Sequence, residues 1–470
     1  MPPRVALILW LISLLALLRF DPAKEKHVSL ALWLPLIWLF IVGSRLPSQW
    51  LGVDASDVAT SQTFEEGSAT DRAILASILL LSVVVLVSRN FNLGRFMTRN
   101  VFLMAFILFA LSSVLWSDFP FISFKRWIRD LGDYLMVLLV LSDPDPLEAV
   151  RTVFRRLFYL LIPLSILLVK YFPQIGKMYE FWSGAPMFVG ASTSKNMLGV
   201  VCLVSGTYFF WDTVARWADR KERRTKWVIR LNVVFIGMTL WLLNLSNSAT
   251  SRVCLAIGCL VIAAAHTKAG KRNPTFLKIL APMSLSIYMI LEYGFGINGQ
   301  LAGMVGRNST LTGRTELWKL LLGMNTNPLV GTGYESFWLG TRLEWIWRNF
   351  TYVNEAHNGY LEMYLNLGII GLSLLLFFLI ASYRDVCKAL DSGASLASLS
   401  LGLWTVLLFY NVTEAAFRSS QLMWLAFLVL ALSIHGWTEQ PVRNAAAKEA
   451  AGVPKRFRPV LPMNPTSARR

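Results

Sequence analysis

The sequence predicts an all-α, polytopic membrane protein with about 12 or 13 transmembrane helices, and three observations predict this class. Of the 470 residues, 55% are hydrophobic and only 16% are charged, whereas a soluble domain is about one quarter charged. The mean hydropathy is +0.51. The apolar residues come in blocks of roughly 15 to 22, close to the length that a helix needs to cross a bilayer. Helices are expected because lipid offers no partners to unpaired backbone groups.

Apolar segments separated by short polar segments are the candidate spans. The first of them is short, and a re-entrant or uncleaved signal-like segment is the alternative to a span there. The number of spans, 12 or 13, and the side of the membrane on which the N-terminus lies depend on that choice. The candidate spans cover residues 5–18, 28–43, 73–88, 101–116, 131–142, 157–172, 196–211, 231–245, 252–265, 279–293, 359–382, 396–411 and 420–436.

The net charge of +17 could indicate nucleic-acid binding, but its distribution argues against that class. Lys and Arg gather in every second loop, as the positive-inside rule requires. These loops and the basic C-terminal tail are therefore expected to be cytoplasmic, with some attraction to anionic lipid. The intervening segments are expected on the opposite side of the membrane; they are residues 44–72, 173–195, 246–251, 294–358 and 412–419.

Motifs for bound cofactors are absent from the sequence. There is no C-x-x-C or H-E-x-x-H pattern and no P-loop, so neither protein-bound zinc nor ATP is indicated. Only four cysteines occur, and no two of them fall in a segment expected outside the cytoplasm, so no disulfide framework is expected. We therefore predict that the protein uses no cofactor and no metal.

The segment 294–358 is the longest expected loop, and loops of this length usually carry function. Thr312 to Met324 is predicted to form a helix with Thr312 as its N-cap. Asn327-Pro328 should end it, and Gly331-Thr332-Gly333 should form a turn. The loop is rich in Trp, Phe and Tyr. An amphipathic helix at the lipid interface, with these aromatics as its belt, is the plain alternative to a functional loop.

His357 lies at the mouth of the expected span 359–382. Histidine has the side chain whose ordinary pKa is nearest neutrality. Arg314 occupies the other end of the same loop, and Asn358 follows the histidine directly. A proton-transfer group beside fixed cations at a membrane surface indicates chemistry on an anionic, lipid-linked substrate.

Three further polar segments are expected on the same side, around Ser192–Asn196, Asn244–Arg252 and Trp116–Arg129. Arg252 stands out because it opens a helix on the side where the positive-inside rule disfavours it. A cation also opposes the helix dipole there unless an anion binds. An arginine snorkelling to the interface is one reading, and a bidentate clamp on pyrophosphate is the other.

Together these segments resemble the O-antigen ligase and Wzy polymerase superfamily of bacterial envelopes. The resemblance is carried, in order, by Gly313–Trp318, Asn327–Tyr334 and His357–Leu361, with Thr250–Arg252 and Ser194–Asn196 before them. No single motif is specific, but their order and spacing together are. The resemblance covers roughly residues 185–385 by motif, and it is nearest to the ExoQ-like polymerases of exopolysaccharides. It implies the membrane architecture of the glycosyltransferase C type.

The resemblance also implies a reaction, namely metal-independent, inverting glycosyl transfer from undecaprenyl pyrophosphate at the periplasmic face of the bacterial inner membrane. Arg252 and Arg314 would hold the donor pyrophosphate, and His357 would orient or deprotonate the acceptor hydroxyl. The expected partners are an undecaprenyl-pyrophosphate-linked oligosaccharide, membrane lipid and a chain-length-regulating membrane protein. The residues expected to bind substrate are Lys195, Asn196, Asn358, Tyr334 and Glu316.

Two other functions stay open. An O-antigen ligase would transfer the polymer to lipid A-core by the same donor chemistry, and a transporter or flippase would show broken helices and buried charges at mid-membrane. The expected domains are residues 1–185, with N-terminal transmembrane helices, and 186–436, the ligase- or polymerase-like core with the loop 294–358. Residues 437–470 are expected to form a basic, disordered cytoplasmic tail.

Overall fold

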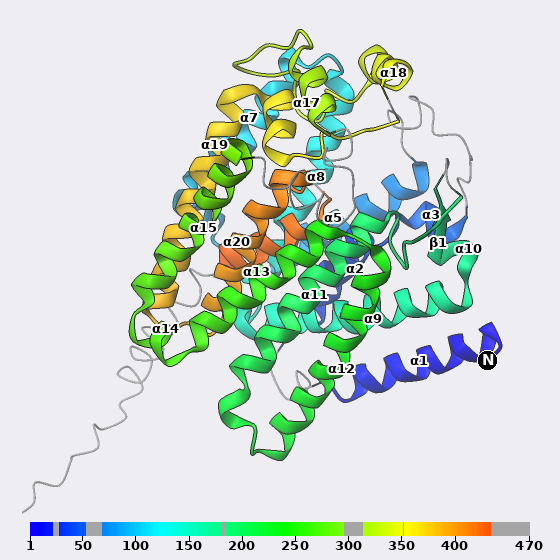
Figure 1. Cartoon of the computed structure of the whole chain (residues 1–470), viewed down its shortest axis with the longest axis vertical. Coiled ribbons are helices and arrows are strands. Elements are labelled where there is room, and N and C mark those ends of the chain that lie inside the picture. Colours follow the sequence, from blue (N-terminus) through cyan, green and yellow to red (C-terminus); the bar gives the residue numbers. More distant parts are fainter. Residues whose placement is uncertain are drawn as a thin grey trace, which may run out of the picture.

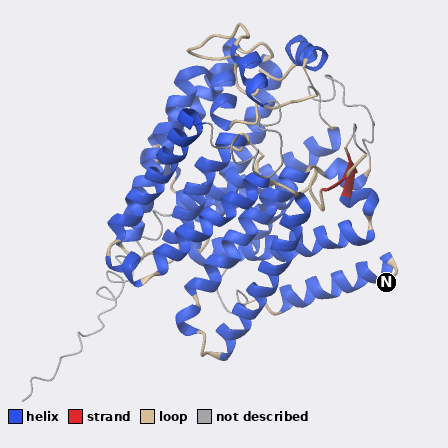
Figure 2. Cartoon of the chain, viewed as in Figure 1, coloured by secondary structure: helices blue, strands red, loops and turns tan. Residues whose placement is uncertain are grey.

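The computed structural model describes residues 1–21, 28–52, 68–180, 184–295, 314–350, 352–418 and 420–433. Within them the chain is nearly all helical, as predicted (Figure 2). The exception is a two-stranded antiparallel sheet of β1 (Lys177–Tyr179) and β2 (Pro186–Phe188), in which Met178 pairs with Met187. The expected tail 437–470 and the predicted N-cap Thr312 lie outside the described residues.

The first half of the chain, up to the sheet, alternates long apolar helices with short ones (Figure 1). Its α-helices are α1 (Pro3–Arg19), α2 (Trp33–Gly43), α3 (Pro47–Leu51), α5 (Ala69–Ser88), α6 (Leu93–Arg99), α7 (Val101–Ser112), α8 (Pro120–Leu141), α9 (Pro146–Tyr171) and α10 (Pro173–Gly176). Single 3₁₀ turns are η2 (Leu30–Leu32) and η3 (Ser113–Trp116).

The second half contains the central helices and the part of the long loop that the structure describes, residues 314–350 and 352–358, called the structured loop below. After the sheet come α11 (Lys195–Ala215), η4 (Trp217–Asp219), α12 (Arg223–Ser246), α13 (Ala249–His266), α14 (Lys268–Arg272), α15 (Pro274–Phe295), α17 (Arg314–Leu322), α18 (Gly340–Asn349), α19 (Gly359–Asp391) and α20 (Ala397–Thr413). A last apolar helix covers Leu422–Ser433.

Six helices of the described chain are long and apolar enough to cross a membrane, namely α5, α9, α11, α12, α13 and α19. A seventh span results if Leu93–Arg99 and Val101–Trp116, which meet at 97°, are counted as one. Leu30–Gly43, α20 and Leu422–Ser433 are apolar but shorter. The structure therefore confirms a multi-pass helical membrane protein. The total of 12 or 13 spans stays a prediction, because the remaining expected spans do not meet these criteria of length and hydropathy.

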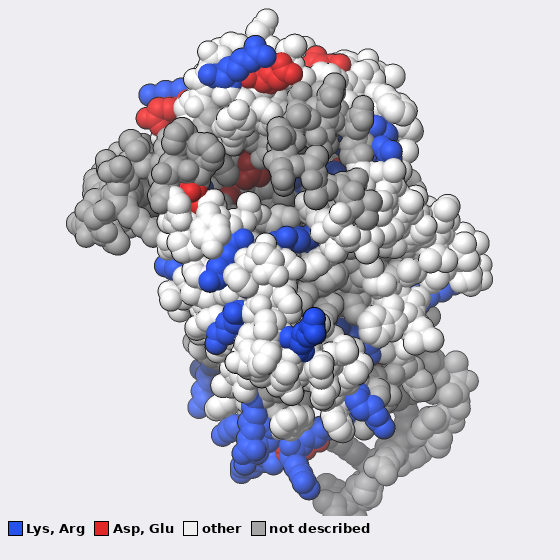
Figure 3. Space-filling model, turned by 90° about the vertical axis from the view of Figure 1, so that its right-hand side faces the viewer, with Lys and Arg blue, Asp and Glu red and all other residues white. Residues whose placement is uncertain are grey.

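Basic residues mark one end of the molecule, and α17 and α18 mark the other. The loop before α12 and the short helix α14 lie at the end away from α17 and α18 (Figure 1). Lys and Arg gather at this end, called the basic end below (Figure 3). The charge alternation read from the sequence thus corresponds to two different ends of one bundle. The positive-inside rule predicts that the end with α17 and α18 faces away from the cytoplasm.

The core is centred on α11, which packs against α9, α12, α13 and α20. Glycines on α11 allow the close approach. A Cβ at Gly199 would lie 2.7 Å from Ser248 Cβ, and one at Gly206 would lie 2.9 Å from Leu255 Cδ1. Small residues at such crossings are typical of helix packing in membranes, where dispersion contacts rather than water exclusion hold helices together. The start of α13 is therefore held against the start of α11.

Residues 314–358 fold onto the start of α19 and form a small core of their own. Its buried members are Leu317, Leu321, Phe337, Trp338, Leu343, Ile346, Ala356 and Leu365. Within this core the buried carboxylate of Glu362 accepts hydrogen bonds from Trp338 Nε1 at 2.7 Å and from the Ala356 amide at 2.9 Å. Phe337 and Trp338 are therefore core residues and not part of the interfacial belt considered from the sequence. Trp345, Phe350 and Tyr352 remain exposed.

The predicted glycine turn is present, and it is fitted to a break in α19. Gly331 has φ +68° and Gly368, inside α19, has φ +63°. The two backbones touch, since a Cβ at Gly331 would lie 2.4 Å from the Asn366 carbonyl carbon and one at Gly368 would lie 2.2 Å from that of Leu329. Only glycine tolerates both the positive φ and this approach. The amide of Ile369 bonds the Pro328 carbonyl, which replaces a helical partner at the break.

Candidate active site

A polar cavity of about 560 Å³ lies where the structured loop meets the ends of α8, α11 and α20. Charged side chains from four separate segments line it, which is unusual for a protein with so few charges. They are Arg129, Glu335, Glu355, His357, Glu414 and Arg418. The cavity is large enough for part of a sugar-phosphate ligand.

Glu414 is the central residue of this cavity. Its carboxylate pairs with Arg314 Nη2 at 2.9 Å, lies 3.5 Å from His357 Nδ1, and accepts from Asn196 Nδ2 at 3.3 Å. The side chain of Glu414 is 7% exposed. One buried carboxylate therefore joins α11, the start of α17 and the start of α19.

Backbone contacts fix Glu414 at the mouth of α19. Its carbonyl accepts from the Gly359 amide at 2.9 Å. The side chain of Asn411 holds the turn by accepting from the amides of Ala416 and Phe417. A Cβ at Gly359 would lie 1.9 Å from Asn411 Oδ1, so a side chain at this position would push the two elements apart. The His-Asn-Gly run thus places His357 beside Glu414.

His357 lies between two carboxylates. Its Nδ1 is 2.9 Å from Glu355 Oε1 and 3.5 Å from Glu414 Oε2, and its backbone is left-handed, with φ +48°. Burial alone would lower the His357 pKa, but the adjacent Glu355 and Glu414 outweigh burial and raise the pKa to about 9. Burial also raises the pKa of Glu355, yet His357 and Arg418 bring it below its usual value. At neutral pH the imidazole is therefore an imidazolium, and the group that can accept a proton is a carboxylate.

Two arginines line the cavity beside this cluster. Arg418 Nη1 is 3.3 Å from Glu355 Oε2, and its Nε is 3.8 Å from Glu335 Oε1. Arg129, from α8, pairs with Asp130 at 3.1 Å. The longer Arg418 contacts leave its guanidinium able to exchange partners for a stronger acceptor. Guanidinium groups can bind phosphate oxygens bidentately.

Arg252 does not line this cavity. It donates to the Asn244 carbonyl at 3.0 Å and to Asn247 Oδ1 at 3.2 Å, across the turn that joins α12 to α13. It lines a separate, mostly apolar groove of about 440 Å³ formed by α11, α12 and α13. Arg252 is connected to Glu414 indirectly. Thr250 stands two residues before Arg252 and Thr413 directly before Glu414, and their hydroxyls are 3.0 Å apart. The two arginines expected to form one clamp therefore occupy neighbouring but separate sites.

Arg252→Lys is expected to lose nearly as much activity as Arg252→Ala if the guanidinium must bind pyrophosphate bidentately. A snorkelling arginine would instead be replaced by lysine almost without loss. Polymer yield from membranes with equal amounts of each variant distinguishes the two. Arg348→Ala, at an exposed position on α18, is the control and should retain wild-type yield.

The other residues expected to bind substrate divide into two groups. Asn196 lines the cavity and bonds Glu414, whereas Lys195 and Glu316 are not among the residues that line it. Asn358 caps α19, its Oδ1 accepting from the amides of Tyr360 and Leu361 at 3.0 Å. Tyr334 is buried and donates to Asp130 Oδ2 at 2.9 Å. In this structure Asn358 and Tyr334 hold the backbone around the cavity, and a substrate role for them stays a prediction.

Sequence reasoning missed Glu414, Glu355, Glu335 and Arg418 as site residues. One signal was present, since Glu414 and Arg418 are the charged residues of a short turn, 412–419, expected on the same side as His357. Arg129 stood in a polar segment noted in the sequence, but nothing there linked it to His357. Their convergence follows from packing between α8, α19 and the turn after α20.

Two comparisons relate this chain to known proteins. Residues 181–376 match the family described as O-Antigen ligase, a range that includes Arg252, Arg314 and His357. Residues 181–376 thus form a region of the O-antigen ligase family. It is also 29% identical over 331 residues to the Exopolysaccharide production protein ExoQ of Rhizobium meliloti (strain 1021), covering 68% of this chain and 72% of that protein. The family match implies glycan transfer with lipid-linked substrates.

The structure brings together a cluster that the sequence did not predict, because Glu355, His357 and Glu414 have ligand atoms within 4.8 Å of one another. Such a trio could hold a metal ion. Its charges are already balanced, however, since Arg314 pairs with Glu414 and Arg418 with Glu355. A divalent cation would have to lie beside two guanidinium groups and displace the proton of His357.

We therefore expect glycan transfer by the purified protein to survive EDTA, in keeping with the prediction that no metal is used. The measurement is turnover before and after EDTA treatment, with Mg²⁺ or Mn²⁺ added back. Loss of turnover in EDTA and its recovery with either ion would contradict the prediction and assign the trio to a metal.

Proposed function

We propose that this protein polymerises undecaprenyl-pyrophosphate-linked oligosaccharide repeat units into exopolysaccharide at the periplasmic face of the inner membrane. The observation that carries the proposal is the pair of Glu414 and His357 in one polar cavity, with Arg314 at the start of α17 paired to Glu414, at the end opposite the basic loops. The similarity to an exopolysaccharide production protein favours a polymerase over other members of the family.

The proposed step is a single displacement at the anomeric carbon. The acceptor hydroxyl oxygen forms the new glycosidic bond while the bond from that carbon to the pyrophosphate oxygen breaks, so the configuration inverts. Undecaprenyl pyrophosphate leaves with the electron pair, and the hydroxyl proton passes to a carboxylate. The leaving group requires positive charge more than it requires a proton, because fixed cations stabilise charge that develops on the leaving oxygen.

The roles of the cavity residues follow from their charges. Arg314, with Arg129 and Arg418, supplies guanidinium groups for the donor pyrophosphate. Glu414 is the proposed general base, since one carboxylate suffices to accept the hydroxyl proton. His357 acts as an imidazolium that orients the acceptor and adds positive charge, which revises the expectation that it deprotonates the acceptor. Arg252, at the head of its apolar groove, would meet the pyrophosphate of a lipid approaching from the membrane.

An O-antigen ligase that transfers polymer to lipid A-core is the second candidate, because it uses the same donor chemistry. The two differ in what accumulates when the protein is absent. Single repeat units on undecaprenol indicate a polymerase, and full-length polymer on undecaprenol indicates a ligase. A transporter or flippase is less well supported, since the charged cavity lies at one end of the bundle. Normal polymer on the outer surface without this protein would contradict both enzyme proposals.

A further inference from the structure

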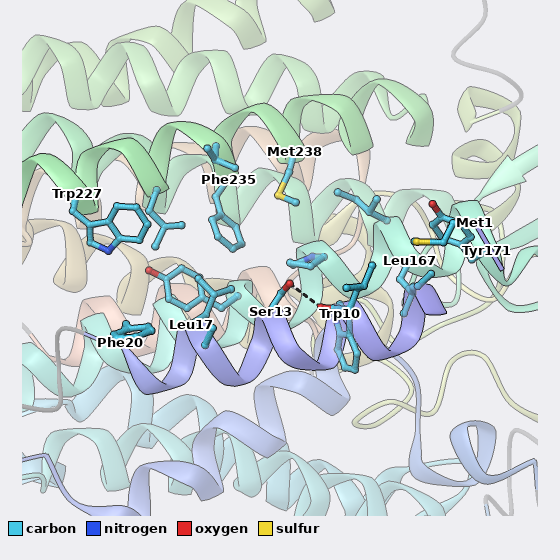
Figure 4. A pocket seen from close by; sticks show the side chains of 18 of the residues that line it. Met1, Trp10, Ser13, Leu17, Phe20, Leu167, Tyr171, Trp227, Phe235 and Met238 are labelled. Carbon is cyan, nitrogen blue, oxygen red and sulfur yellow. Dashed lines mark hydrogen bonds between the residues drawn. The ribbon is translucent and has the colours of Figure 1, made fainter. Parts of the chain in front are cut away.

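A second, apolar groove lies far from the proposed active site, between α1, α9 and α12. Its volume is about 740 Å³. Figure 4 shows Leu17 and Trp10 of α1 facing Phe235 and Met238 of α12 across it. The hydroxyl of Ser13 already donates to the Leu9 carbonyl at 2.7 Å, so it adds no free polar group to the wall. A groove of this kind among membrane helices suits hydrocarbon chains.

Helix α1 packs mainly against α9, and most of its residues are exposed. Ala6 is its only buried residue, and the groove separates it from α12 (Figure 4). The end of α1 is held by Asp21, whose carboxylate pairs with Arg155 at 2.6 Å and Arg156 at 2.6 Å. The helix is therefore fixed at its C-terminal end beside α9 and leaves the groove open along its length.

Two arginines stand beside one end of the groove. Phe20 and Trp227 lie at one end, and Met1 and Tyr171 lie at the other (Figure 4). Arg19 precedes Phe20, and Arg223 begins α12 one turn before Trp227. Both arginines are exposed and have no ion-pair partner within the described part of the chain. The N-terminus of α12 adds its partial positive charge there.

The groove also contains two polar atoms without partners. The hydroxyl of Tyr159 and Nε1 of Trp10 are buried and make no hydrogen bond within the described residues, and both residues line the groove. Tyr159 is 1% exposed and lies one turn from Arg155, which is tied to Asp21. An unsatisfied buried donor costs free energy, so a ligand oxygen at this depth would be stabilising. A hydrocarbon chain alone provides no oxygen that could accept such a hydrogen bond.

We propose that this groove binds an anionic phospholipid from the leaflet at the basic end. Its acyl chains lie along the apolar walls of α1, α9 and α12. Its ester oxygens accept from the Tyr159 hydroxyl, and its phosphate lies at Arg19 and Arg223. Basic pockets between membrane helices on the cytoplasmic side are suited to such head groups. The bound lipid fills the space between α1 and α12 and is independent of the proposed glycan transfer.

The test uses the full-length, delipidated protein in detergent, with phosphatidylglycerol and phosphatidylcholine of identical chains as probes and native mass spectrometry as readout. Wild type should retain phosphatidylglycerol in preference to phosphatidylcholine. Each arginine replaced by Gln should weaken phosphatidylglycerol binding about fivefold, so Arg19→Gln with Arg223→Gln should abolish the preference. Arg272→Gln, on α14 and away from the groove, is the matched control and should retain it.

Two more variants locate the lipid. Tyr159→Phe removes one hydroxyl from the wall and should weaken phosphatidylglycerol binding, while Ala16→Trp should fill the groove and release both lipids. Thermal unfolding of each variant without lipid checks that it is folded. Equal retention of the two lipids by wild type, or undiminished phosphatidylglycerol binding by the double arginine variant, would overturn the proposal.

Discussion

Glu414→Gln is expected to reduce glycan transfer by about 10²–10⁴-fold, the range typical for loss of a general base. Glutamine keeps the size of the side chain and can still accept hydrogen bonds, so Arg314 and Asn196 retain a partner. It removes the charge that accepts the proton. It also removes one of the two carboxylates that hold His357 protonated. The measurement is the turnover of lipid-linked repeat units by purified protein, normalised to the folded amount.

The matched control for Glu414→Gln is Glu344→Gln, at a partly exposed position on α18, where the carboxylate makes a long surface pair with Arg348 at 3.4 Å. Exposed pairs of this kind contribute about 0–1 kcal/mol, so transfer should be unchanged. A Glu414→Gln protein that is folded and transfers glycan at the wild-type rate would remove Glu414 from catalysis and leave Glu355 as the candidate base.

His357→Ala is expected to abolish polymer formation while the protein stays in the membrane at normal amounts. Loss of a proton-transfer or charge-stabilising group costs about 10²–10⁴ in rate. Because His357 and Glu414 act in one cluster, the double variant should be little worse than the more damaging single variant, since residues of one network do not add. Near-normal polymer from a well-expressed His357→Ala protein would contradict any catalytic role for this residue.

The pH dependence of the wild-type enzyme separates the two possible roles of His357. Its pKa is raised to about 9, so the imidazolium persists through neutral pH. If the imidazolium is required, the turnover number should fall as pH rises through about 9. If the neutral imidazole were the base, turnover would instead rise toward that pH, by about tenfold per unit.

The same shift predicts how stability depends on pH. A folded-state pKa above the ordinary value near 6.5 means that the ion pairs of His357 stabilise the protein fully below about pH 6.5. This contribution is lost as the pH rises through about 9. In His357→Ala, that part of the alkaline decline in thermal stability should be absent.

Part of the site was predictable because its signals are local in the sequence. His357 stands in a short motif at the start of an apolar segment, and Arg314 in another at the start of a helix. The structure places both beside Glu414. The Arg252 turn was equally visible, but its separation from this cavity was not, because a sequence motif shows which groups exist and not which helix ends meet.

Other expectations depended on contacts that no local pattern encodes. Asn358 and Tyr334 looked like ligand-binding residues from their place in the motifs. The structure uses Asn358 to cap α19 and Tyr334 to bond Asp130 on α8. Polar side chains next to backbone ends are often used in this way, since buried donors and acceptors must be paired.

The sequence by itself determined the class of protein, the basic end and the positions of the motifs. Transfer of a segment into lipid and the side taken by its basic loops depend on composition over about 20 residues. Only the tertiary structure decided that Glu414 joins Asn196, Arg314 and His357, which are up to 218 residues apart along the chain. That meeting depends on the close crossing of α11 and α13 at Gly199 and on the contact of Gly359 with Asn411. Packing between helices distant in sequence sets both contacts, and hydropathy does not specify them.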